Sequence, residues 1–220
     1  MEGNTETTFP PARGRRKAAP EAGFRLRRST ALWGTTLSAK VPLGAGDYGQ
    51  ALGFVRQPVL WHAYQDVFDE IPVPDRYRIF RDVWDRADHS HADLHPEALT
   101  VVFSTAADDP DHLARRARIT ALPTNDPTGE TLTVYRGHQG HPGDLRRPVT
   151  AASWTTDPAA ARWFATRFGP GYVLEGRVHR TDVVDAYDPT SHDARATAER
   201  EILVIPGRVR DTRVLPGSPA

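Results

Sequence analysis

The chain has 220 residues, of which 39% are hydrophobic and 25% charged, a composition typical of one globular domain or at most two small ones. Its 28 basic residues, all arginine except Lys17 and Lys40, are interspersed with 28 acidic ones, which argues against a DNA-binding fold. The chain has no cysteine, which excludes disulfides, thiolate metal sites and cysteine nucleophiles. No apolar run approaches the length of about 18 residues that a membrane helix needs, so we expect no membrane partner.

The two ends of the chain have the composition of flexible segments. Residues 1–40 combine arginines and prolines with few large apolar side chains, so we expect a flexible basic tail, with a polyanion-binding arm or a transport address as alternatives. The tail lacks the apolar stretch of a classical signal peptide, which predicts a cytoplasmic protein or one delivered into a target cell without such a signal. Residues 213–220 are predicted to be a flexible C-terminus, in a loose end that begins near Thr212. A single domain remains at 41–212.

The first half of this domain, residues 41–128, has the apolar spacing of helices. Apolar residues recur three and four positions apart in two segments, which predicts two amphipathic helices separated by Pro72 and Pro74. Pro96, and Asp109 with Pro110, begin two later short segments, so we expect a helical lobe. The apolar residues are Leu60, Trp61, Tyr64, Phe68 and Ile71 in the first segment and Tyr77, Phe80, Val83 and Trp84 in the second.

The second half, residues 129–212, changes to the alternating pattern of strands. One helix interrupts the strands: Thr156 or Asp157 can cap it, and Pro158 suits its first position. Its apolar stripe consists of Ala161, Phe164, Ala165 and Phe168, and a Gly-Pro-Gly turn ends it. The alternation is clearest at Leu132 and Val134, from Val149 to Ser153, from Tyr172 to Val178, and in a last strand from Glu201 to Ile205.

Three histidines lie close together beside aspartates, at His89, His91 and His95. Neutral imidazoles and carboxylates are zinc or iron ligands. His89 and His95 are six residues apart, however, and share no helix face. We therefore interpret this segment as an exposed polar turn and expect no metal.

Polar side chains gather at three predicted strand ends: Tyr135-Arg136-Gly137, Ser153-Trp154-Thr155 and Glu199-Arg200-Glu201. Positions two apart on a strand point to the same face, so Ser153 should project with Thr155, and Glu199 with Glu201. Two carboxylates side by side cost stability unless cations or hydroxyls compensate them, which points to a functional site. The alternative is ordinary solvation of an edge strand.

The order of these motifs resembles the arginine–serine–glutamate, cholera-toxin-like class of mono-ADP-ribosyltransferases, including small actinobacterial and phage members. The resemblance covers Thr131 to Pro206: Tyr-Arg-Gly on a strand, Ser-x-Thr leading through Asp-Pro into an alanine-rich helix with Trp163 and Phe164, and Glu-x-Glu before Ile-Leu-Val. It implies an α+β, split mixed β-fold of two packed sheets, with an NAD cleft between them and the helical N-terminal lobe over one side.

The resemblance also implies how the chain would hold NAD, which is the substrate. Arg136 would grip the pyrophosphate, because a guanidinium matches phosphate oxygens in pairs. Gly137 would let the backbone approach the nicotinamide carboxamide. Phe168 or Tyr172 would stack on the nicotinamide ring, with a place in the core as the alternative for each.

The implied catalytic residues are Glu201, Glu199 and Ser153. Glu201 would oppose the oxocarbenium-like charge that forms as the bond to nicotinamide breaks. Ser153 would hold Glu201 and the ribose in register, with Thr155 as support. Glu199 would orient the acceptor, which in this class is usually a protein arginine when a glutamate stands there. The implied enzyme is an NAD-dependent protein-arginine ADP-ribosyltransferase acting on an unidentified macromolecule.

Three alternatives remain open. The same pocket could serve an NAD glycohydrolase, with water as the acceptor. An RNA-directed transferase is suggested by the segment from Arg136 to His141, which faintly resembles a stretch of the NAD-dependent RNA 2′-phosphotransferases, although a nucleic-acid partner is less favoured. The third alternative is a non-catalytic module that uses the NAD fold for binding, because Ser-Trp-Thr stands where many members have Ser-Thr-Ser.

Overall fold

The computed structural model describes residues 46–87, 95–142, 150–188 and 199–216 of the chain. Within these ranges the chain forms six α-helices and six β-strands, which confirms the predicted α+β class. The predicted tail at 1–40 lies outside the described residues, as do His89, His91 and Val149.

Five helices precede the strands: α3 (Tyr48–Gly53), α4 (Gln57–Val67), α5 (Val73–Arg86), α6 (Pro96–Ser104) and α7 (His112–Ala121). The two predicted amphipathic helices are confirmed as α4 and α5, and the two later segments as α6 and α7. The prediction missed α3, because six residues are too few for a helical period to show. None of the helices in the described ranges combines the length and the apolar character needed to cross a membrane.

Proline begins these helices as well as separating them. Pro72 is the N-cap residue of α5, and Pro74 lies in its first turn, where the missing N–H would have had no helical partner. Pro58 and Pro96 occupy the same place in α4 and α6. The break predicted at Pro74 therefore falls inside the start of the second helix.

Aromatic rings hold the helices together. The ring of Trp61 in α4 lies 5.4 Å from that of Phe80 and 6.0 Å from that of Trp84, both in α5, between ring centres. Phe80 is also 5.5 Å from Phe103 in α6. Leu203, from a late strand, belongs to the same buried cluster, so the helices pack directly against one part of the sheet.

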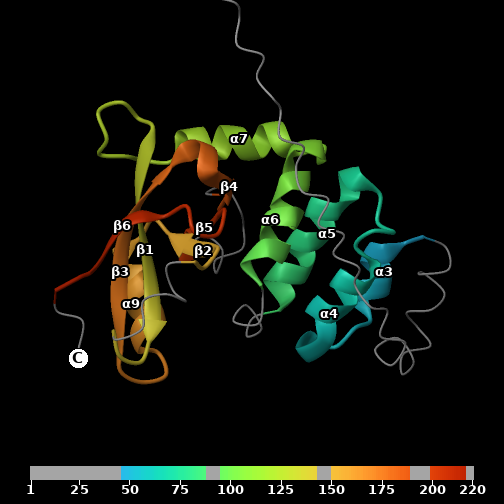
Figure 1. The fold of residues 1–220 in the computed structure, drawn as a ribbon, viewed down its shortest axis with the longest axis horizontal. Helices are drawn as coiled ribbons and strands as arrows, with labels where there is room; N and C mark the ends of the chain where they lie inside the picture. Colours follow the sequence, from blue (N-terminus) through green and yellow to red (C-terminus); the bar gives the residue numbers. More distant parts are fainter. Residues whose placement is uncertain (1–45, 88–94, 143–149, 189–198, 217–220) are drawn as a thin grey trace, which may run out of the picture.

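The strands form one six-stranded sheet of order β4-β5-β2-β1-β3-β6, with every pair antiparallel. They are β1 (Thr131–Gln139), β2 (Ser153–Thr155), β3 (Gly171–His179), β4 (Val183–Ala186), β5 (Glu201–Val204) and β6 (Arg210–Val214). For the described residues, the expectation of two separate sheets with mixed strand directions is wrong. In Figure 1 the helices α3 to α6 lie on one side of the molecule and the strands on the other, with α7 across the top.

Two strands were not predicted. β4 has only four residues, and β6 lies partly in the segment that was predicted to be a loose end from Thr212 onward. β6 pairs with β3, for example through Arg213 opposite Glu175. The chain is therefore ordered as a strand as far as Val214.

The sheet is almost divided at its centre. β1 pairs with β3 along its whole length, but it meets β2 at a single pair, Tyr135 opposite Thr155. We call this meeting point the strand junction. The half β4-β5-β2 lies on one side of it and the half β1-β3-β6 on the other.

Helix α9 (Pro158–Thr166) packs against β1 and β3 and begins as predicted, with the side chain of Asp157 accepting from the Ala159 amide at 2.7 Å. Ala161 and Ala165 are buried against the strands. Phe168 lies beyond the end of the helix and is 70% exposed, so its predicted place in the buried stripe is wrong.

Candidate functional site

The strand junction brings Ser153 and Glu201 into direct contact. In the β2–β5 pair, Thr155 lies opposite Glu201 and Ser153 lies opposite Leu203. This register sets Ser153 and Glu201 on one face, and the Ser153 hydroxyl donates to Oε1 of Glu201 at 2.7 Å. The glutamate side chain is 25% exposed, so the carboxylate is fixed yet still reachable from solvent.

Arg136 reaches the same place from β1. Its Nη1 donates to the main-chain oxygen of Ser153, which joins Arg136, Ser153 and Glu201 in one chain of hydrogen bonds. Its Nε is buried and has no hydrogen-bond partner in the part of the chain that the structure describes. Burial lowers the pKa of Arg136 below its ordinary value, and the negative charge of Glu201 opposes this shift. Arg136 is thus a cation with donor capacity that the described residues do not use.

Helix α5 supplies two contacts to Glu201 that the sequence analysis did not identify. The indole Nε1 of Trp84 lies 3.2 Å from both carboxylate oxygens, and Nη1 of Arg81 lies 3.7 Å from Oε2. The two residues are three positions apart and therefore share a helix face. Spacing alone gave no indication that this face meets β5.

Arg81 is held by further carboxylates. Its Nε lies 3.5 Å from Oδ2 of Asp185 in β4, and its Nη2 lies 3.1 Å from Oδ1 of Asp85. Asp185 is itself buried and accepts from Arg118 and from the Tyr77 hydroxyl, each at 3.2 Å. Burial disfavours the charge on Arg81, but Glu201 and Asp185 outweigh it and raise the pKa of Arg81 above its ordinary value.

Thr155 ties together the segments around the junction. Its hydroxyl donates to the main-chain oxygen of Glu199 at 2.7 Å and accepts from the Asp157 amide at 3.0 Å. One side chain therefore links the residues just before β5 to those just before α9, which fixes the backbone that leads into Glu201.

Glu199 lies outside the strand that begins at Glu201. The intervening Arg200 has φ of 46°, in the left-handed region, so the backbone turns there. The expectation that Glu199 and Glu201 share a strand face is wrong, because strand alternation does not extend through such a residue.

The absence of a side chain at Gly137 is explained by helix packing. A Cβ there would come within 2.1 Å of the Ala161 carbonyl oxygen and 2.6 Å of the Ala165 nitrogen. These are main-chain atoms of α9 that cannot yield without moving the helix. The glycine therefore permits close packing of α9 on β1, a role that the sequence analysis did not propose.

The two candidate stacking residues are in different environments. Tyr172 is buried in the core, 1% exposed, with its ring parallel to that of His138 at 5.3 Å between centres. Phe168 lies at the surface, and the guanidinium of Arg167 is 4.7 Å from its ring centre. Tyr172 is nevertheless close enough to Arg136 to act on its charge: together with Glu201 it opposes the lowering of the Arg136 pKa by burial.

His95 is the member of the histidine cluster that the structure describes, and it lies 3.8 Å from Glu97 at the surface. Across the described ranges, no group of three histidine, aspartate or glutamate residues is arranged to hold a metal ion.

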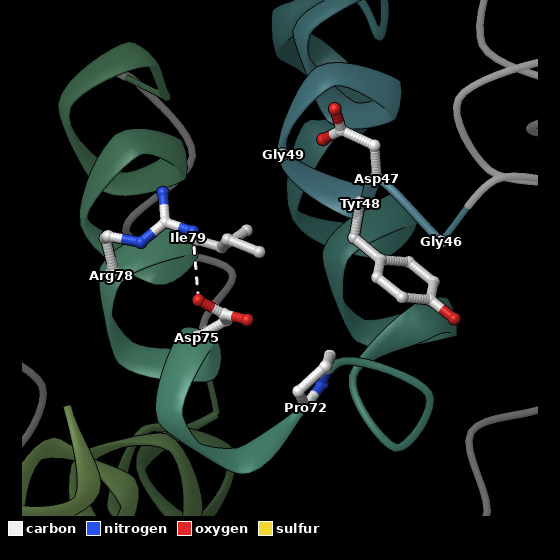
Figure 2. A pocket seen from close by; sticks show the side chains of 8 residues that line it. All are labelled: Gly46, Asp47, Tyr48, Gly49, Pro72, Asp75, Arg78 and Ile79. Carbon is white, nitrogen blue, oxygen red and sulfur yellow. Dashed lines mark hydrogen bonds and ion pairs between the residues drawn. The ribbon is translucent and has the colours of Figure 1, made fainter. Parts of the chain in front are cut away.

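A hollow of about 290 Å³ lies between the start of α3 and the first turns of α5. Figure 2 shows Asp75 and Arg78 facing Asp47 and Tyr48 across it. Asp75 is paired with Arg78 at 3.0 Å, and Asp47 caps α3 by accepting from the Gln50 amide at 3.0 Å. Both carboxylates of the hollow are therefore engaged in local structure, and none of the predicted site residues lines the hollow. The lining residues are Gly46, Asp47, Tyr48, Gly49, Pro72, Asp75, Arg78 and Ile79.

Comparison with known proteins adds no relative: no family model, no curated protein and no solved structure matches this chain.

Proposed function

We propose that the chain is an NAD-dependent mono-ADP-ribosyltransferase, which releases nicotinamide and transfers ADP-ribose to a protein arginine. The observation that carries the proposal is the chain of hydrogen bonds from Arg136 through Ser153 to Glu201. These residues come from three strands, and the motif resemblance assigns them to one NAD site. An arrangement with Arg136 and Glu201 on opposite sides of the molecule would have ruled this function out.

Arg136 is suited to the pyrophosphate of NAD. One nitrogen of its guanidinium is anchored to the Ser153 carbonyl, so the group is oriented before the ligand arrives. Its remaining donors match phosphate oxygens in geometry and charge. Binding a dianionic pyrophosphate would also offset the burial that disfavours the charge of Arg136.

Glu201 is suited to stabilise positive charge on the ribose. As the glycosidic bond to nicotinamide breaks, the ribose gains oxocarbenium character and the leaving ring takes the bonding electron pair. A fixed carboxylate beside the ribose opposes that charge without having to reorganise. The Ser153 hydroxyl and the Trp84 indole fix the carboxylate in this way, and its partial exposure leaves a route for the ribose hydroxyl.

Although the described strands form a single sheet, its near division supports an NAD site at the strand junction. A single residue pair joins the two halves at Tyr135 and Thr155, and the three motif residues gather around it. Helices cover the side of the sheet that contains Glu201, as a lobe beside an NAD cleft would.

The acceptor assignment rests on Glu199 and on the resemblance. The tie from Thr155 to the Glu199 carbonyl keeps this residue close to the start of β5. A carboxylate beside the reacting carbon can orient an arginine guanidinium and accept its proton as the nitrogen attacks.

The test incubates three proteins with NAD: the wild type, Glu201→Gln and the control Glu97→Gln. Glu97 is a suitable control because its side chain is 82% exposed. We expect wild type and control to release nicotinamide and to leave ADP-ribose on protein arginines, detected by mass spectrometry. Glu201→Gln should lower the rate roughly 100-fold or more, the effect of losing one fixed transition-state partner.

Three outcomes would contradict the proposal. Equal rates of nicotinamide release for the wild type and Glu201→Gln would show that Glu201 takes no part in the reaction. A wild type that releases no nicotinamide would show that the chain lacks the proposed activity. Free ADP-ribose without any adduct would replace the transferase by the glycohydrolase.

A further inference from the structure

We propose that Trp84 and Arg81 are positioning residues for Glu201, so that helix α5 completes the catalytic site as well as packing beside the sheet. This inference rests on the proposed function, because it assigns the two residues to that same site. Neither belongs to the motifs that suggested the activity, and both lie more than 100 residues before Glu201 in the chain.

The indole N–H of Trp84 is a hydrogen-bond donor with a fixed orientation. Its ring is buried, packs edge-on against Trp61 at 6.0 Å and lies tilted against Phe80 at 5.5 Å. The indole has a single N–H, and this group lies equally close to both oxygens of Glu201. Rotating the ring would disrupt the aromatic cluster, so the direction of the hydrogen bond is set by core packing.

Ser153 and Trp84 together define the orientation of the carboxylate. Ser153 donates to Oε1 alone, whereas Trp84 lies between Oε1 and Oε2. A carboxylate has about four acceptor positions, so these donors leave capacity for a ribose hydroxyl. The same two contacts oppose rotation of the carboxylate and therefore also fix the position of Oε2.

Arg81 adds a fixed positive charge beside Oε2. At 3.7 Å the contact with Glu201 is an ion pair and not a hydrogen bond, and Arg81 is held in place mainly by Asp185 and Asp85. Asp185 is in turn fixed by Arg118 and Tyr77. Three elements, β4, α5 and α7, therefore determine where this charge lies.

The consequence concerns the chemical step more than NAD binding. Trp84 and Arg81 contact the carboxylate that acts on the ribose, whereas the pyrophosphate partner, Arg136, is anchored to Ser153. Loosening the carboxylate should lower kcat and leave the KM for NAD nearly unchanged.

The kinetic test compares Arg81→Gln and Arg81→Lys with the control Arg78→Gln, another α5 arginine that pairs with an aspartate and has a half-exposed side chain. We expect Arg81→Gln to lower kcat for nicotinamide release roughly 10- to 100-fold, with KM for NAD changed less than about 3-fold. Arg81→Lys should recover much of the rate, and Arg78→Gln should match the wild type. An unchanged kcat in Arg81→Gln, or a change confined to KM, would overturn the proposal.

A second measurement needs no enzymatic turnover. In ¹⁵N-labelled protein the indole resonance of Trp84, assigned by its loss in Trp84→Phe, should move in Glu201→Gln and in Arg81→Gln and stay in place in Arg78→Gln. An unmoved resonance in Glu201→Gln would overturn the contact. If the wild type releases no nicotinamide, the proposed function fails while this resonance still decides whether α5 positions Glu201.

Discussion

Two arginines held inside the molecule, Arg115 in the helical region and Arg136 at the strand junction, use their donors differently. Arg115 binds Oδ2 of Asp109 at 2.9 Å, donates to the Ala106 carbonyl and lies 4.4 Å from the ring centre of Tyr77. Arg136 donates to the Ser153 carbonyl, has no carboxylate within ion-pair distance among the described residues, and has a buried Nε without a hydrogen-bond partner there.

The difference separates a structural arginine from one suited to a ligand. Buried polar groups in folded proteins are almost always satisfied, so one that is left over calls for an explanation. The charge of Arg115 is fully compensated by its own surroundings. Among the described residues, that of Arg136 is compensated from a distance, first by Glu201 and then by Tyr172, and an anionic ligand would complete the compensation.

The largest effect should follow from breaking the compensated pair. Arg115→Ala leaves the carboxylate of Asp109 buried without its cation, which costs about 3–5 kcal/mol of unfolding free energy. Urea denaturation measures this, with the exposed Arg78→Ala as a control that should change stability by less than about 0.5 kcal/mol. A small loss in Arg115→Ala would mean that Asp109 finds water or another cation, and the contrast with Arg136 would disappear.

A smaller effect on stability should follow from Arg136→Gln. The variant loses one hydrogen bond but also removes a buried charge with an unsatisfied nitrogen, so we expect a change within about 1 kcal/mol. Its affinity for NAD, measured by calorimetry, should fall roughly 10-fold or more, since bonds to charged groups are the stronger ones. A destabilisation as large as that of Arg115→Ala would show that Arg136 is structural too.

The smallest effect concerns a carboxylate that is satisfied at the surface, Asp126 in the turn before β1. The Thr128 hydroxyl at 2.7 Å and the Thr131 amide at 2.8 Å lower the pKa of Asp126 from its ordinary value of 3.8 to about 2. Its contribution to stability is therefore complete above the ordinary value and is lost as the pH falls through the folded value. Between pH 5 and pH 2, a range that includes both pKa values, the urea midpoint should fall less steeply with pH for Asp126→Asn than for the wild type. An equal pH dependence of the two midpoints would contradict the assignment.

Much of the fold followed from local patterns. Apolar periodicity predicted α4, α5 and α9 and the strands β1, β3 and β5, because each buries one face or both. β6 was missed because its sequence, Arg-Asp-Thr-Arg-Val, lacks apolar alternation, as an edge strand can. β4 was missed because four residues are too few to show alternation.

The candidate site was predictable only where it lies on strands. Alternation put Ser153 on the same face as Thr155, and the motif resemblance, not any strand pattern, assigned Arg136, Ser153 and Glu201 to one site. The prediction that Glu199 shares a strand face with Glu201 failed because no local pattern indicated the left-handed backbone of Arg200. Trp84 and Arg81 were missed because the packing of α5 on β5 is a tertiary contact, which no periodicity within α5 encodes.

The short pairing of β1 with β2 has a consequence for Arg136. Continued by two residues, the register of Tyr135 with Thr155 would set Gly137 opposite Ser153, and an uninterrupted ladder would compete for the main-chain oxygen of Ser153. Because the ladder stops early, that oxygen is left to receive a side chain. The strand junction thus leaves a main-chain acceptor for the guanidinium of Arg136, and continued pairing of β1 with β2 would remove that acceptor.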